Sequence, residues 1–181
     1  MRRPHSDEYH PFYETYVARV PATELITTLA AAPDALESLL QPVTEADELF
    51  AYAAGKWSFR QLLGHVIDTE RLFFYRALHF ARGDSAELPG MEQEEWVADS
   101  NAEQRSVADQ LAEFRALRTA NTAFFAALDE QSLARGGVAS GCEVTVRALV
   151  FIAAGHELHH RAVLAERYLP ALTAHHEASR G

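Results

Sequence analysis

Cysteine, proline and glycine are all scarce in this sequence. A single cysteine among 181 residues, Cys142, excludes an intramolecular disulfide framework and a cysteine-rich zinc site. The low numbers of glycine (9) and proline (7), beside 48% hydrophobic residues, favour helices over a turn-rich β fold. The length predicts one domain, residues 1–181, with a sizeable core.

Positive charge is also in short supply. The chain has 16 Lys and Arg residues against 26 Asp and Glu residues, and its formal net charge is −10 with histidine neutral. Nucleic acids and anionic lipid surfaces both attract Lys and Arg, and no basic stripe interleaved with aromatic residues occurs in the sequence. We therefore expect no nucleic-acid partner and no membrane partner.

Long apolar runs are absent as well. The longest uncharged apolar stretch, Ala148 to Ala154, is far shorter than the roughly 20 residues of a membrane-spanning helix. The N-terminal stretch MRRPHSDEYHPFYETYV lacks the apolar core of a signal peptide. These two absences predict a cytoplasmic protein.

Helical periodicity accounts for most of the chain. Four amphipathic patterns, at about residues 22–40, 58–83, 102–128 and 145–168, are separated by recognisable stop signals, and no convincing strand pattern occurs. They predict an all-α protein, a four-helix bundle over about residues 22–170, with a short N-terminal extension and a frayed C-terminal tail.

Single residues mark several of the expected helix ends. Ser58 is the predicted N-cap of the second helix, and Gly83 is its predicted stop. Pro33 is expected to kink or split the first helix, and the fourth is expected to end before Pro170.

Two connections separate the last three helices. The acidic segment 86–100 contains Pro89-Gly90 and is expected to pass over one end of the bundle. Segment 134–145, ARGGVASGCEVT, is expected to be a Gly/Ser-rich turn.

Three histidines and a glutamate occupy the hexapeptide GHELHH, residues 155–160. On a helical wheel of about 100° per residue, His156 and His160 lie in the middle of the apolar face, whereas Glu157 and His159 fall towards its edges. Because Cβ atoms at positions i and i+4 are only about 6 Å apart, the two inward imidazoles can reach one ion.

Two explanations compete for these inward histidines. A lone buried histidine usually makes ordinary hydrogen bonds within the core. Two stacked neutral imidazoles each need a donor and an acceptor, but their neighbours here are aliphatic, and a divalent cation would accept both lone pairs. A third ligand must come from another helix, and His65 is the best-placed candidate, at the border of the buried arc of the second helix.

Glu70 falls well inside the same arc, where a carboxylate needs a partner. We expect this partner to be the distal N–H of a ligand histidine or an arginine such as Arg76, and a plain structural ion pair is the other interpretation. Cys142 is either a further ligand or a small buried side chain. Surface positions are expected for the remaining histidines, which are His5, His10, His79, His175 and His176.

Several longer segments carry a resemblance to a known family. The stretches KWSFRQLLGHVIDTERLFFYRALHFARGD, LPG, EFRALRTAN and VTVRALVFIAAGHELHHRAVLAERYL resemble the DinB/YfiT-like superfamily of bacterial proteins. This is not the DNA polymerase that shares the DinB name. The resemblance extends from about HPFYETYV to ERYLP and implies a bundle in up-down-down-up order, often a homodimer. It also implies a divalent metal ion, typically zinc or nickel, held by His65, His156 and His160.

The resemblance implies a metal-dependent enzyme acting on a small molecule. Three imidazoles leave a coordination position open, which is typical of catalytic zinc. Relatives include S-transferases that use bacillithiol, mycothiol or glutathione, and proteins described as metal-dependent hydrolases. We favour a small-thiol-dependent S-transferase over a hydrolase, with Glu70, Glu157 and His159 as partners of the ligands or pocket residues. The acidic segment 86–100 and nearby arginines would shape the substrate pocket.

Two further functions stay open. His156 to His160 matches the zincin motif H-E-x-x-H, with Glu157 as the general base. Against it, Val163 replaces the glycine of the metzincin extension, and no clear third ligand follows. The other alternative is a non-catalytic stress-response protein in which the metal ion ties two helices together.

Overall fold

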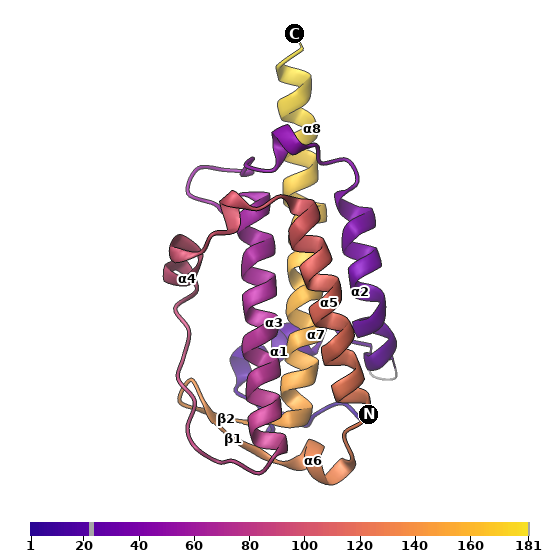
Figure 1. Cartoon of the computed structure of the whole chain (residues 1–181), viewed down its shortest axis with the longest axis vertical. Helices are drawn as coiled ribbons and strands as arrows, with labels where there is room; N and C mark the ends of the chain where they lie inside the picture. Colours follow the sequence, from indigo (N-terminus) through magenta and orange to yellow (C-terminus); the bar gives the residue numbers. More distant parts are fainter. Residues whose placement is uncertain (22–23, 181) are drawn as a thin grey trace.

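Four long helices run side by side in the computed structural model, which describes residues 1–21 and 24–180. Helices α2 and α7 rise in Figure 1 while α3 and α5 descend, so the order is up-down-down-up. The predicted four-helix bundle is therefore confirmed. The long helices are α2 (Leu25–Leu40), α3 (Phe59–Ala81), α5 (Val107–Ala126) and α7 (Val146–Val163).

The second helix has both of its predicted ends. Ser58 caps α3 by accepting a hydrogen bond from the Gln61 backbone N–H, while the Gln61 side chain accepts from the Ser58 backbone N–H. Gly83 follows the helix with φ +82°, a left-handed conformation that ends it. The capping box thus fixes where the helix that carries His65 begins.

The chain crosses the whole length of the bundle between α3 and α5. Because these helices run in the same direction, the connection 82–106 must return alongside them, and it carries the short helix α4 (Gln93–Asp99) and a 3₁₀ turn (Ala102–Gln104) (Figure 1). The prediction that segment 86–100 covers one end of the bundle was wrong. Helix α5 also starts later than predicted, at Val107, since Ser106 is its N-cap.

A small β-hairpin replaces the predicted turn at 134–145. Strands β1 (Gly136–Ala139) and β2 (Cys142–Thr145) pair antiparallel after the short helix α6 (Glu130–Ala134). Ser140 and Gly141 both have positive φ values, 55° and 71°, which suit a tight hairpin turn. Two glycines in β1 and only four residues per strand leave no alternating pattern, so the hairpin was missed.

Helix α2 continues through Pro33 rather than splitting there. Proline removes one helical hydrogen bond, but Leu29, Ala32 and Leu36 are all buried on the same helix and anchor both of its halves. The predicted start of this helix, residue 22, lies outside the described residues.

The C-terminal tail is helical, contrary to the prediction. After α7 the chain makes a π-helical turn (Leu164–Tyr168) and continues as α8 (Leu169–Ala178), which extends beyond the bundle in Figure 1. Pro170 lies in the first turn of α8, and the wider π turn before it relieves the usual clash of proline with the preceding turn. His176 contacts Asp47 at 2.7 Å and holds the new helix in place.

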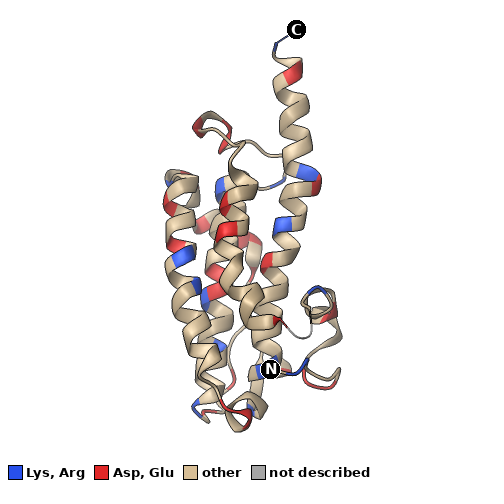
Figure 2. Ribbon diagram, turned by 90° about the vertical axis from the view of Figure 1, so that its right-hand side faces the viewer, with Lys and Arg blue, Asp and Glu red and all other residues tan. Residues whose placement is uncertain are grey.

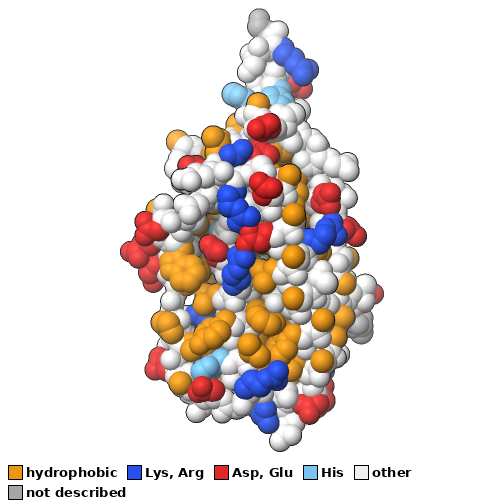
Figure 3. Space-filling model, viewed as in Figure 1, with side chains coloured by type: hydrophobic (Ala, Val, Ile, Leu, Met, Phe, Trp, Pro, Cys, Tyr) orange, Lys and Arg blue, Asp and Glu red, His pale blue; other side chains and the backbone are white. Residues whose placement is uncertain are grey.

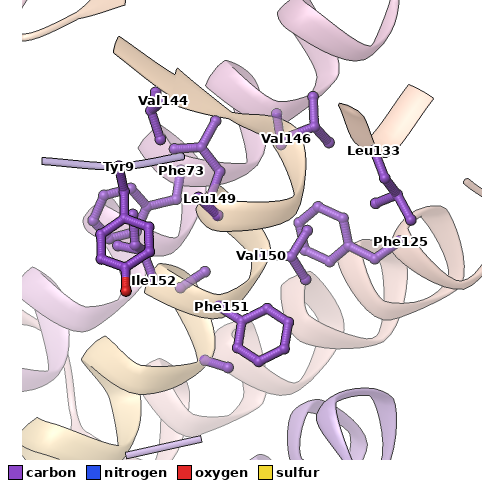
Figure 4. Close-up of a cluster of buried hydrophobic side chains, with 14 of the residues drawn as sticks. Tyr9, Phe73, Phe125, Leu133, Val144, Val146, Leu149, Val150, Phe151 and Ile152 are labelled. Carbon is purple, nitrogen blue, oxygen red and sulfur yellow. The ribbon is translucent and has the colours of Figure 1, made fainter. Parts of the chain in front are cut away.

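The hydrophobic core has two parts. One packs the N-terminal half of α7 against the C-terminal half of α3, the end of α5 and the hairpin, with Phe73, Phe125 and Phe151 among its members (Figure 4). The second packs the N-terminal half of α3 against α2, the start of α5 and Leu164. A layer of buried or half-buried polar side chains lies between the two clusters on α3, α5 and α7: Thr69, Glu70, Arg118, Asn121, His156, Glu157 and His160.

The surface carries mixed charge. Basic residues alternate with acidic ones along the helices in Figure 2, and hydrophobic side chains gather on the lower half of the face shown in Figure 3. Within the described part of the chain, no helix is both long and apolar enough to cross a membrane.

Candidate metal centre

Three imidazoles from two helices converge in the polar layer. His65 comes from α3, and His156 and His160 lie one turn apart on α7. The Nε2 atom of His156 lies 3.2 Å from Nε2 of His65 and 3.1 Å from Nε2 of His160. One ligand atom from each ring lies within 4.8 Å of the others, so this group could hold a metal ion.

Burial keeps all three rings neutral. It lowers the pKa of His65 to about 4 and that of His160 to about 3. The pKa of His156 falls well below its ordinary value, again chiefly through burial and secondarily through the neighbouring imidazoles. Near neutral pH the rings therefore offer lone pairs rather than positive charge.

Thr69 fixes which nitrogen of His156 carries the proton. The Thr69 hydroxyl donates to the backbone carbonyl oxygen of His65 at 2.7 Å, so towards Nδ1 of His156, 3.3 Å away, it can only accept. This hydrogen bond requires a proton on Nδ1 and leaves Nε2 of His156 with a free lone pair. Thr69 thus orients the central imidazole towards the other two.

The arrangement of lone pairs fits a cation. One lone pair on Nε2 of His156 can accept a hydrogen bond from either neighbouring ring but not from both, whereas a cation accepts lone pairs from all three. Nitrogens bound to zinc at 2.0–2.1 Å with tetrahedral angles are about 3.3 Å apart. The distances from Nε2 of His156 to its two neighbours, 3.2 and 3.1 Å, are close to this value. Nδ1 of His160 is buried without a hydrogen-bond partner within the described residues.

Aromatic rings enclose the imidazoles. Trp57 lies 4.7 Å from His65, and Tyr16 lies 5.3 Å from His156, measured between ring centroids. Tyr16 belongs to the short helix α1 (Glu14–Val17), which reaches the site because Gly155 has no side chain. A β-carbon on Gly155 would overlap the Tyr16 backbone carbonyl.

One cavity, of about 310 Å³, opens beside His65 and His156, and we call it the tyrosine-side cavity. Its walls come from α1, one face of α3, the crossover and the hairpin turn. Burial raises the pKa of Tyr16, so its hydroxyl stays protonated. The lining of this cavity includes Tyr16, His65, Leu72, Phe73, Arg76 and His156.

A second cavity, of about 320 Å³, opens beside His159 and His160, and we call it the tryptophan-side cavity. Trp57 forms part of its wall and donates from Nε1 to Glu94 on α4 at 3.1 Å. Gln93 lines both cavities. The three imidazoles therefore have a cavity on each side, with the crossover segment beside both.

A sequence model of the DinB superfamily matches residues 28–164. The chain belongs to this superfamily. The DinB-superfamily match contains all three converging histidines, and no curated protein matches the chain.

Among solved structures, the DinB-superfamily chain is similar to YfiT from Bacillus subtilis. That protein is described as a probable metal-dependent hydrolase with an unusual four-helix bundle topology. The two share 20% sequence identity and a TM-score of 0.71, over 82% of this chain and 88% of YfiT. At this identity the likeness supports the DinB-type fold.

Glu70 is buried as predicted but pairs with α5 rather than with a ligand histidine or Arg76. Its Oε2 accepts from Arg118 at 3.0 Å and its Oε1 from Asn121 at 2.8 Å. The expected partners were wrong, because the helical wheel of α3 does not show which residues α5 brings opposite it, whereas the other interpretation, a plain structural ion pair, is confirmed. In this DinB-superfamily chain Glu70 therefore belongs to a structural ion pair behind the imidazoles.

Glu157 is buried, at 2% exposed. Its nearest charged partner is Arg161, at 3.6 Å, and neither carboxylate oxygen has a hydrogen bond within the described chain. Burial raises its pKa, and Arg161 and Arg118 act in the opposite direction. In the H-E-x-x-H interpretation this carboxylate acts on water beside the metal ion, but Glu157 lines neither of the two cavities beside the imidazoles.

The other candidates are dispersed. His159 lines the tryptophan-side cavity, and its ring lies 5.1 Å from that of His160. Cys142 is half-buried on β2 and is not part of the converging group. His79 is half-buried rather than exposed, with Nε2 3.3 Å from the Ala86 carbonyl oxygen. Thr69 was missed, although its position four residues after His65 places both on one helix face.

Proposed function

We propose that this protein is a metal-dependent enzyme whose divalent ion, zinc or nickel, is bound by His65, His156 and His160. The observation that carries the proposal is the convergence of three neutral Nε2 atoms, with 3.1 and 3.2 Å between neighbours. Bound there, such an ion supplies Lewis acidity, which ionises a thiol or a water molecule near neutral pH.

The preferred reaction is transfer of a small thiol to an electrophile. The thiol loses its proton, its sulfur bonds to an electrophilic carbon such as that of an epoxide or halide, and the leaving oxygen or halide departs with the bonding electron pair. Two cavities flank the imidazoles, which suits a reaction with two substrates. Lys56 and Arg167 line the tryptophan-side cavity and provide positive charge for a charged thiol such as glutathione or bacillithiol.

Hydrolysis is the second candidate, because the structurally similar YfiT is described as a probable metal-dependent hydrolase. In that reaction water takes the place of the thiol, and one cavity suffices for the substrate. The non-catalytic alternative, a stress-response protein, would need no cavity beside the metal ion. The two cavities favour an enzyme over that alternative.

Metal analysis of the purified protein tests the ligand set. We expect about one divalent ion per chain in the wild type and none in His156→Ala. The exposed His5→Ala variant is the control for the loss of a histidine and should keep its metal ion. Equal metal content in wild type and His156→Ala would contradict the ligand assignment.

Activity assays then separate the reactions. Glutathione, bacillithiol and mycothiol are tested with 1-chloro-2,4-dinitrobenzene, and 4-nitrophenyl acetate is tested without thiol. Metal-dependent conjugation supports the transferase, whereas metal-dependent ester hydrolysis without conjugation supports the hydrolase. A metal-loaded protein inactive in both assays favours the non-catalytic alternative.

A homodimer and a cytoplasmic location complete the proposal. The superfamily resemblance suggests the first, and the sequence composition suggests the second. Analytical ultracentrifugation of the purified protein tests the dimer.

A further inference from the structure

Three arginines are buried in this structure, and one of them lacks a counter-charge. Arg118 pairs with Glu70 at 3.0 Å, and Arg147 pairs with Glu8 at 3.2 Å. Arg76 is equally buried, at 3% exposed, but no carboxylate of the described residues lies within salt-bridge distance of it. A buried cation without a partner is costly, so its presence requires an explanation.

The contacts of Arg76 are all with neutral groups, namely the Pro89 carbonyl and the hydroxyls of Ser140 and Tyr13. Nη2 donates to the Pro89 carbonyl oxygen at 2.7 Å and to Ser140 Oγ at 2.9 Å. Nε is buried with no hydrogen-bond partner. Burial lowers the pKa of Arg76, and the nearby Tyr13 hydroxyl acts in the opposite direction. Donor capacity and a positive charge both remain available.

Arg76 lines the tyrosine-side cavity at the opposite end of α3 from His65. The two residues are eleven positions apart, which is about three helical turns, so they share one face of the helix. Side chains on a helix lean towards its N-terminus, so the long Arg76 side chain leans back towards the imidazoles. The charge of Arg76 and the lone pairs of His65 and His156 therefore belong to one cavity.

The wall between these two ends carries apolar and aromatic side chains beside the Thr69 hydroxyl. Leu72 and Phe73 of α3 lie between Arg76 and His65, and Tyr16 faces them from α1. Glu92 is the acidic residue that lines this cavity, and it is exposed to solvent, which weakens its effect on Arg76. A ligand that fits has an anionic end and an apolar body.

We propose that Arg76 is the anchor for an organic carboxylate bound in the tyrosine-side cavity. The carboxylate accepts hydrogen bonds from the free guanidinium N–H groups, and the apolar body lies on Tyr16 and Phe73. The far end of the molecule reaches His65 and His156, which makes this carboxylate the electrophilic substrate. Only that last step rests on the proposed function, since the anion site is built without the metal ion.

A purely structural role is the competing explanation. Arg76 joins the crossover to the hairpin turn through Pro89 and Ser140, and it would do so without any ligand. The two roles differ in one measurable respect. An arginine that only links the crossover to the hairpin turn would not make the cavity bind an anion more tightly than a neutral molecule of the same shape.

The test is isothermal titration of metal-free protein with 3-phenylpropanoate and with its neutral amide, 3-phenylpropanamide. Without metal, coordination cannot contribute to the difference between the two probes. We expect the carboxylate to bind at least about tenfold more tightly than the amide, as for a hydrogen bond between charged groups. Higher ionic strength should reduce this preference. Equal affinities, or no binding of either probe, would overturn the proposal.

Variants assign the preference to Arg76. Arg76→Gln should bind the two probes alike, and Arg76→Lys should retain part of the preference. The control is Arg82→Gln, which removes one exposed positive charge near the end of the same helix and should keep the full preference. A carboxylate preference that survives in Arg76→Gln would overturn the assignment.

A folding defect and a failure of the proposed function can both be distinguished from a failure of the anion site. If Arg76→Gln fails to fold, the wild-type comparison and Arg76→Lys still decide the question. If metal analysis fails to find a bound ion but the carboxylate preference is present, the proposed function fails and the anion site stands. If metal binds but the preference is absent, the anion site fails alone.

Discussion

The Thr69 hydroxyl lies between two residues of the candidate metal centre, 2.7 Å from the His65 carbonyl oxygen and 3.3 Å from Nδ1 of His156. Because it donates to the carbonyl, it can only accept from the imidazole. It therefore selects the tautomer in which Nε2 of His156 is free. A residue outside the three imidazoles thus determines whether the central one offers its lone pair to a metal ion.

Replacing Thr69 by valine should weaken metal binding by about 10- to 100-fold, the usual effect of removing a hydrogen-bond partner of a ligand histidine. Valine has the same shape but cannot accept the proton of Nδ1. Competition with a chromogenic chelator measures the affinity. Thr69→Ser keeps the hydroxyl and should bind like the wild type; an unchanged affinity in Thr69→Val would show that the tautomer is set by other contacts.

The close approach of α1 to α7 yields a second prediction. A β-carbon on Gly155 would overlap the Tyr16 carbonyl, so Gly155→Ala must push α1 away from the imidazoles. We expect a loss of about 2 kcal/mol or more in the free energy of unfolding, measured in urea. In the control Gly90→Ala, the new atom would meet Ser140 at an ordinary 3.7 Å, and stability should not change. A stable Gly155→Ala protein would contradict the packing of α1.

Regular helical periodicity explains what the sequence could predict. His156 and His160 share a helix face, and the structure places their Nε2 atoms 3.1 Å apart. The apolar arc of α3 likewise predicted His65 at its border, and in the structure this histidine meets His156 of α7. By contrast, the contact of Thr69 with His156 and the contacts of Arg76 with Pro89 and Ser140 join different elements, which a helical wheel cannot place.

The wrong predictions also depended on tertiary contacts. Pro170 signals a helix end, but the π turn and the contact of His176 with Asp47 let the chain continue as a helix. Gly136 and Gly137 suggest a flexible turn, yet they lie in a strand, and Gly137 packs so closely on Phe80 that a side chain there would overlap the ring. At both places tertiary contacts, rather than the local sequence signal, determined the secondary structure.

The buried pair of Glu70 and Arg118 yields a third prediction. Glu70→Leu leaves Arg118 buried and unpaired, and Arg118→Met leaves Glu70 without its cation, so each should lower the free energy of unfolding by about 3–5 kcal/mol. The double variant removes both charges and should cost clearly less than the sum of the two single changes. A double-mutant cycle in urea measures the coupling. Additive losses would mean that the two side chains act independently.

The depressed histidine pKa values predict how the metal-free protein responds to pH. The folded-state pKa of His65 is about 4, below the model-peptide value of 6.5. Between these values the unfolded chain binds a proton that the folded chain does not, so stability falls as pH falls below about 6.5 and is constant above it. Between pH 7 and pH 5, His65 alone should account for about 2 kcal/mol. His160, with a pKa of about 3, acts in the same direction.

Two acidic residues also change the stability of the protein with pH, and their effects must be separated from that of His65. Glu8, whose pKa is lowered to about 2, also loses stabilising interactions in acid, but its unfolded-state titration is centred below pH 5. Glu157 opposes the histidines, since burial raises its pKa and the folded chain then takes up protons more readily. Subtracting the urea unfolding profile of His65→Gln from that of the wild type, between pH 7 and pH 5, cancels both effects. If the two profiles run parallel, His65 carries no depressed pKa and the imidazoles are not held neutral by burial.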